Sequence, residues 1–191
     1  MIQHETPDYF FKNEVHIVKR MKRKDESNAE RVVYGAMLGV IAAILQTSGM
    51  FGGIGLLISA LSSLPIVLAA LRSLQTSFLT YLVTFALLSM IQPGEAYLYL
   101  FTTGLLGLSM GFTFRTFKKG WMIVIFSAVA LMLVILFLLF VIQFPVLGPS
   151  VGEELDLRMV IYIFLFTLMY SFIWMKGIIF IVNKYAAIAG E

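Results

Sequence analysis

Apolar residues run along this chain in long blocks rather than in the alternating pattern of a half-buried strand. After a polar stretch over residues 1–31, blocks of about 17–24 residues alternate with short breaks. A helix needs about 20 apolar residues to cross a bilayer core, and a spanning segment must satisfy its own backbone groups, which favours helices. The pattern predicts an all-α polytopic membrane protein, a bundle of six spans at about 32–48, 54–71, 75–91, 97–114, 121–144 and 159–182.

Charge decides whether the glycine-rich break GMFGGIG, residues 49–55, separates two helices or interrupts one. With six spans, 12 of the 14 Lys and Arg residues fall on one side of the membrane, seven in residues 1–31 and the others at Arg72, Arg115, Lys118, Lys119 and Lys184. Opposite them lie Glu95, Glu153, Glu154 and Asp156, with Arg158. Because basic residues are retained in the cytoplasm, we expect both termini there and a bacterial inner (cytoplasmic) membrane location. Merging the first two spans would move Arg72 outside.

The composition agrees with a lipid environment. Charged residues make up 13% of the chain, against about 25% in soluble domains. The absence of cysteine excludes disulfides, thiolate metal sites and cysteine nucleophiles. The net charge of +3 does not indicate nucleic acid, because the basic residues flank spans, where topology explains them.

Three regions follow from this pattern: a basic cytoplasmic tail at 1–31, a six-span domain at 32–183 and a cytoplasmic C-terminus at 184–191. No cleavage site ends the first apolar run, so we expect that span to be retained. In the tail, Phe11, Val15 and Val18 follow helical spacing among basic residues. Two interpretations stay open: a basic amphipathic helix on an anionic inner leaflet, or a tail that only fixes topology.

Small residues form two strips at helical spacing. Gly35, Gly39 and Ala43 share one face of the first span, and Gly104, Gly107 and Gly111 share one face of the fourth. In lipid, helix association depends on close van der Waals packing, which small residues permit. Both strips fit packing within the bundle, and the first also fits docking of a partner helix. Pro65 predicts a kink in the second span, with Ser62 and Ser63 satisfying the carbonyls that it frees.

Two segments resemble a known family. LSSLPIVLAALRS at 61–73 and LYLFTTGLLGLSMGFTFRT at 98–116 resemble the YybS-like family of bacterial membrane proteins, which is similar to the substrate-binding S components of energy-coupling-factor (ECF) transporters. The resemblance implies an S-component-like six-helix fold. It also implies that Gly35, Gly39 and Ala43 dock on a transmembrane coupling subunit served by cytoplasmic ATPases.

Polar side chains gather at the expected outer ends of the spans. The resemblance implies that they line a ligand pocket near the outer face, with GMFGGIG as a lid; the alternative is that they cap and anchor helix ends. The ligand-binding candidates are Gln46, Thr47, Gln92, Glu95, Tyr97, Tyr99 and Gln143.

Catalysis is not expected. No Asp, Glu or His lies within a span, so paired carboxylates, metal ligands and a base for a serine nucleophile are lacking there. Lys176 is the one charge inside the sixth span, and its stem can carry the ammonium to the interface; alternatively the span ends near it. No cofactor or metal site is expected.

We therefore expect a membrane subunit that binds a small molecule at the outer face for ATP-driven uptake through a partner coupling module, since the chain has no phosphate-binding loop. The alternative is a non-transporting scaffold that recruits partners through its basic tail and small-residue faces.

Overall fold

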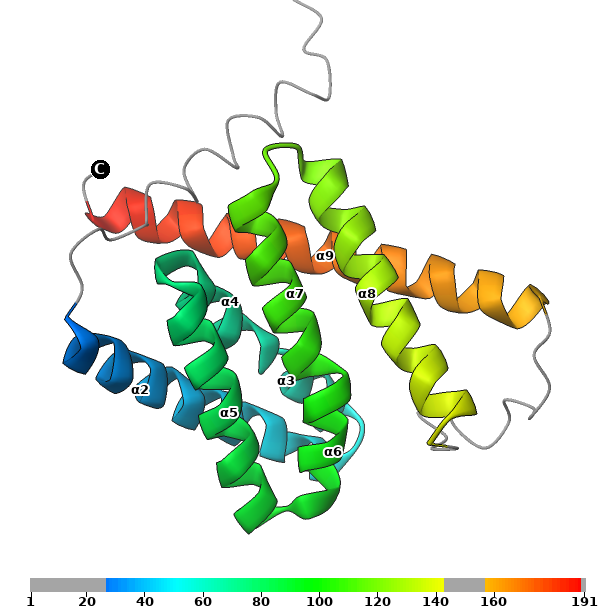
Figure 1. The fold of residues 1–191 in the computed structure, drawn as a ribbon, viewed down its shortest axis with the longest axis horizontal. Coiled ribbons are helices and arrows are strands. Elements are labelled where there is room, and N and C mark those ends of the chain that lie inside the picture. The colour runs from blue at the N-terminus through cyan, green and yellow to red at the C-terminus, as the bar shows by residue number, and fades with distance from the viewer. Residues whose placement is uncertain (1–26, 143–156, 190–191) are drawn as a thin grey trace, which may run out of the picture.

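The computed structural model describes residues 27–142 and 157–189, and these residues are almost entirely helical (Figure 1). In chain order the elements are α2 (Asn28–Thr47), the 3-10 helix η1 (Ser48–Phe51), α3 (Ile54–Ala60), α4 (Ser63–Arg72), α5 (Leu74–Ile91), α6 (Pro93–Phe101), α7 (Thr103–Thr116), α8 (Gly120–Phe140) and α9 (Leu157–Ala189). The expected helix in the N-terminal tail lies outside the described residues.

Six helical segments are long and apolar enough to cross a membrane. They are Asn28–Phe51, Ile54–Arg72, Leu74–Ile91, Pro93–Thr116, Gly120–Phe140 and Leu157–Val182, and they match the six expected spans in order. The prediction of an all-helical, multi-pass membrane protein is thus confirmed. The first helix begins four residues before the expected apolar boundary because Ser27 and Glu30 form a capping box, each side chain bonding the other's backbone N–H.

Two of the six spans are broken. The second is divided into α3 and α4 at Leu61–Ser62, and the fourth into α6 and α7 at Thr102, whose φ of −116° and ψ of −88° are not helical. Pro65 lies in the first turn of α4, where a missing N–H costs little. Ser63 donates to the carbonyl of Ala60, as expected of a serine beside a kink. Nothing in the sequence pattern predicted the break at Thr102.

The strip on α2 packs against α5 of the same chain. A Cβ at Gly39 would lie 2.8 Å from Val83 Cγ1, and one at Gly35 would lie 3.1 Å from Leu79 Cδ2. This close approach lets Thr80 Oγ1 donate to the carbonyl of Gly35 and Thr84 Oγ1 to that of Gly39, each at 3.1 Å. Repeated glycine in an apolar helix thus exposes backbone acceptors to threonine hydroxyls on the neighbouring helix.

The strip on α7 also lies within the bundle, mainly against α4. A Cβ at Gly107 would lie 2.9 Å from Ile66 Cβ, and one at Gly111 would overlap Ala70 Cβ. Gly104, just after the break, faces the rings of Tyr81 and Tyr99. Only hydrogen fits at these positions.

Buried apolar residues form two clusters. One joins α2, α4, α5 and α6 around Ile66, Leu88 and Tyr99. The other joins α4, α7, α8 and α9 around Met110, Phe114 and Met175. The second cluster packs α9 mainly on α8, which it crosses in Figure 1.

The last helix is continuous through Lys176. It has 33 residues, about 50 Å at 1.5 Å per residue, so it is longer than a bilayer core requires. Lys176 is half-buried within it. Helical backbone continues past Lys176 to Ala189, and the apolar segment long enough to span reaches Val182. The alternative that the membrane span itself ends near Lys176 stays a prediction.

The two ends of the bundle differ in chemistry. At the end that we call the basic end, Arg31 Nη1 donates to Gln75 Oε1 at 2.8 Å, and Arg115 Nη1 donates to the carbonyls of Ala70 and Arg72. Arg72 stacks on Tyr34, 3.9 Å from the ring centroid. Lys118 and Lys119 are exposed beside them in the chain. We call the opposite end, where α5 meets α6, the Glu95 end.

We predict that Gly39→Ala lowers the free energy of unfolding by about 1–3 kcal/mol, because the methyl group overpacks the α2–α5 contact. Val83→Ala in the same chain should restore part of this loss by making room. Unfolding in mixed micelles with increasing sodium dodecyl sulfate measures both.

Gly94→Ala is the matched control, since a Cβ at Gly94 meets nothing within 4 Å. Equal losses for Gly39→Ala and Gly94→Ala would contradict the packing account.

Candidate functional site at the Glu95 end

One buried amide holds the polar groups of the Glu95 end together. Gln46, near the end of α2, is only 3% exposed. Its Oε1 accepts hydrogen bonds from Ser62 Oγ at 2.7 Å and from Thr103 Oγ1 at 2.8 Å. Its Nε2 donates to Glu95 Oε2 at 2.8 Å. A single side chain of the first span therefore bonds the second and fourth spans.

The orientation of this amide follows from its partners. An ionised carboxylate only accepts hydrogen bonds, and an amide nitrogen only donates them. The Gln46 nitrogen must therefore face Glu95, which leaves the amide oxygen for the two hydroxyl groups.

Both hydroxyl groups come from the helix breaks. Ser62 lies at the break between α3 and α4, and Thr103 is the first residue of α7, directly after the break at Thr102. In a regular helix a serine or threonine hydroxyl commonly bonds its own preceding turn. Here the hydroxyls of Ser62 and Thr103 instead reach a neighbouring span, which fixes α2 between the two breaks.

Glu95 lies in the first turn of α6, where the helix dipole favours a negative charge. The side chain is half-buried. Gly49 packs directly against its carboxylate: a Cβ at Gly49 would lie 3.0 Å from Oε1 and 3.1 Å from Oε2. The connection after α2 thus covers one face of the carboxylate with backbone alone.

That connection needs glycine for its conformation as well. Gly52 and Gly53 have φ of +60° and +46°, which side chains rarely tolerate, and a Cβ at either would meet nothing within 4 Å. Ser48 Oγ donates to the carbonyl of Gly55 at 3.0 Å and ties the connection to the start of α3. The expected break at 49–53 is therefore a folded turn between two helices.

What we call the Gln46 cluster consists of Gln46, Gly49, Ser62, Glu95 and Thr103. The other predicted ligand-binding residues do not join it. Thr47 Oγ1 donates to Ala43 of its own helix. Tyr99 is fully buried, and its hydroxyl donates to the carbonyl of Tyr81 at 3.4 Å. Gln92 precedes α6, and its buried Oε1 has no hydrogen-bond partner in the described chain. Gln143 lies outside the described residues.

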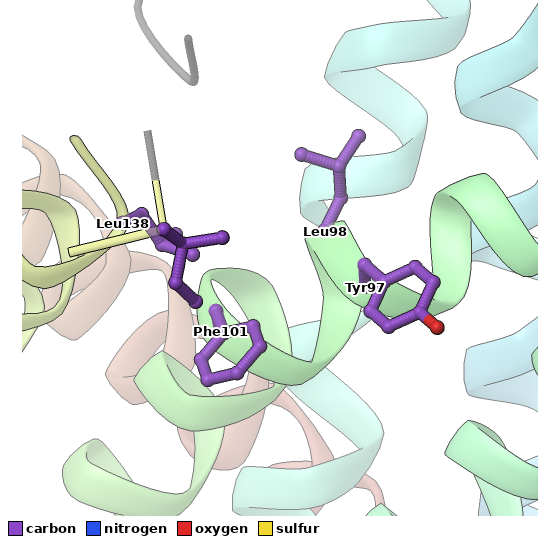
Figure 2. Close-up of a pocket in the computed structure, with 5 residues that line it drawn as sticks. Tyr97, Leu98, Phe101 and Leu138 are labelled. Carbon is purple, nitrogen blue, oxygen red and sulfur yellow. The ribbon is translucent and has the colours of Figure 1, made fainter. Parts of the chain in front are cut away.

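Tyr97 lies on a different face of α6 from Glu95, since two residues turn a helix by about 200°. It is 62% exposed and lines a cavity of about 430 Å³ between α6 and α8 (Figure 2). The other lining residues are Leu98, Phe101, Leu138 and Ile142. None of these residues bonds to Gln46 or Glu95, so the cavity is separate from the polar groups around Gln46.

The strip expected to dock a partner helix is covered. Gly35, Gly39 and Ala43 are all buried in the bundle, Gly35 and Gly39 against α5. Between the two interpretations left open by the sequence, this structure has the internal one. The threonines of α5 occupy the space that a partner helix would need.

Sequence reasoning missed three members of the cluster as site residues: Gly49, Ser62 and Thr103. A signal was present in the sequence, because pairs of hydroxyl residues at 62–63 and 102–103 interrupt otherwise apolar spans. Only the break at Thr102 brings its neighbour Thr103 to Gln46.

Ser62 and Thr103 both donate their hydroxyl protons to the amide oxygen of Gln46, which cannot act as a base for a nucleophile. Within residues 27–142 and 157–189, no three His, Cys, Asp or Glu side chains gather to hold a metal ion.

Comparisons with protein-family models, curated proteins and solved structures give no match.

We predict that Gln46→Leu lowers the free energy of unfolding by about 2–4 kcal/mol. The change leaves the buried Ser62 hydroxyl without its partner, at about 1–3 kcal/mol for a buried group. The half-exposed Thr103 hydroxyl and Glu95 carboxylate also lose their partner and add a smaller loss. Detergent unfolding of the purified chain measures the loss.

Thr47→Val, one residue further along α2, should change stability by less than about 1 kcal/mol, because Thr47 bonds only its own helix. A Gln46→Leu protein as stable as Thr47→Val would refute the bridging role.

Proposed function

We propose that this protein is a membrane subunit that binds a small molecule at its Glu95 end for uptake through a partner coupling module. The observation that carries the proposal is the Gln46 cluster, in which an oriented amide holds a half-buried carboxylate. Binding sites place a few fixed polar groups against apolar walls, and this cluster has that composition.

Two further features support a ligand site over simple helix capping. Glu95 lies at the end of the bundle, yet its side chain is half-buried rather than exposed. The backbone of Gly49 approaches the carboxylate with no side chain between them. The cluster also joins the first, second and fourth spans, and it does so where the second and fourth are broken. In membrane transporters, discontinuous helices commonly surround the bound substrate.

The proposal does not retain the docking strip. Since Gly35 and Gly39 pack on α5, the coupling partner has to bind another surface of the bundle. ATP hydrolysis falls to that partner, because no phosphate-binding loop occurs in the sequence.

The proposal includes an orientation, with the basic end in the cytoplasm. Arg31, Arg72 and Arg115 cluster there with two exposed lysines, and the positive-inside rule places such a cluster in the cytoplasm. The Glu95 end then faces outside, where a solute for uptake arrives.

Native mass spectrometry of the full chain, purified in mild detergent, tests the binding function. We expect a retained small molecule in the natural protein and its loss in Gly49→Ala, because the added methyl group displaces the Glu95 carboxylate. Gly94→Ala, a glycine change in open space on α6, should retain it.

A chain that carries no small molecule, with or without a co-purified subunit, would count against uptake. If deletion of residues 1–31 then produced a cellular phenotype, the scaffold alternative would stand in its place.

Cysteine labelling tests the orientation, because the chain has no native cysteine. A membrane-impermeant maleimide applied to intact cells should label Gly94→Cys and leave Lys118→Cys unlabelled until the cells are opened. Both positions are exposed, so the reverse pattern would place the Glu95 end in the cytoplasm and reject uptake at that end.

A further inference from the structure

We infer that the molecule bound at the Gln46 cluster carries a protonated amine, which pairs with Glu95 Oε1. The inference rests on the proposed function and narrows it to cationic ligands. It depends on which hydrogen-bonding groups of the cluster are already engaged and which one is left.

The two carboxylate oxygens of Glu95 differ in their partners. Oε2 accepts a hydrogen bond from Gln46 Nε2 at 2.8 Å. Among the described residues, no side chain or backbone N–H donates to Oε1. A carboxylate oxygen accepts hydrogen bonds and repels other acceptors, so Oε1 selects a ligand group that donates.

The distribution of charged side chains also favours a cationic ligand. Arg31 and Arg115, whose guanidinium groups bond residues of α4 and α5, lie at the opposite end of the bundle. Within the described ranges, Glu95 forms no ion pair. A half-buried carboxylate loses part of its hydration, and a cationic ligand replaces that loss with a charge-assisted hydrogen bond.

The donors of the cluster are already used, which disfavours an anionic ligand. Ser62 Oγ and Thr103 Oγ1 both donate to Gln46 Oε1. The nearby phenol groups donate to backbone carbonyls, Tyr81 to Leu100 and Tyr99 to Tyr81. A phosphate or carboxylate ligand would therefore meet Glu95 with no free hydroxyl of this cluster to bind it.

The carboxylate is also held in place before a ligand arrives. Gln46 is buried, and its amide is fixed by two hydroxyl groups. Gly49 limits movement from the other side, since its backbone lies against both carboxylate oxygens. A group that is already ordered loses little conformational entropy on binding.

Thermal unfolding of the full chain in dodecylmaltoside and phosphate buffer tests the inference with matched probes. The pairs are ethanolamine with ethylene glycol and 1,4-diaminobutane with butane-1,4-diol, which exchange an amine for a hydroxyl group. We expect at least one amine to raise the unfolding temperature saturably, while its matched alcohol does not. In Glu95→Gln the midpoint concentration should rise at least tenfold.

Glu30→Gln is the control for charge. It removes one carboxylate at the basic end and keeps an amide that can complete the capping box with Ser27. The amine midpoint in Glu30→Gln should stay within twofold of that of the natural protein, which separates local pairing from a change in net charge.

Several outcomes would overturn the inference. They are equal stabilisation by amine and alcohol, stabilisation by sodium chloride at the same concentration, an unchanged midpoint in Glu95→Gln, and no amine-dependent shift at all. A neutral or anionic molecule retained in native mass spectrometry would reject the amine and leave the proposed binding function intact.

Discussion

The structure depends on how closely α2 approaches α5. Lipid chains are as apolar as the helix surfaces, so burial of apolar side chains contributes little to helix association in a bilayer. Contact has to come from close packing and from interhelical hydrogen bonds, and the Gly35 and Gly39 positions provide both. Hydrogen in place of a side chain brings the carbonyls of α2 within reach of Thr80 and Thr84. This contact sets where α2 lies along the bundle.

The position of α2 in turn sets the geometry of the Glu95 end. Gln46 lies near the end of the helix that this contact anchors, at the level of both helix breaks. A shift of α2 by one turn, about 5.4 Å, would carry the amide away from Ser62 and Thr103. The packing contact and the polar cluster are thus two parts of one arrangement, one along the α2–α5 contact and one at the Glu95 end.

The sequence predicted the spans well and the site in part. Block length and charge gave six helical segments in the right order, because hydrophobic length is a local property. Gln46 and Glu95 were both expected at the outer ends of spans, and in the structure they form a hydrogen bond, since topology brings span ends together. Thr103 and Gly49 escaped notice because their roles arise from a break at Thr102 and from a close backbone approach, which depend on tertiary packing. Tyr97 was expected in the same pocket because it begins the fourth span and because of the family resemblance, neither of which takes account of the helix face on which it lies.

The shared acceptor at Gln46 has a mechanical consequence. Ser62 and Thr103 belong to different spans, yet their hydroxyls end on the same oxygen atom. If the chain moves at either break, the Gln46 amide either moves with it or loses a hydrogen bond, at a net loss of about 1 kcal/mol. The two breaks are therefore coupled through one amide, which also holds the Glu95 carboxylate.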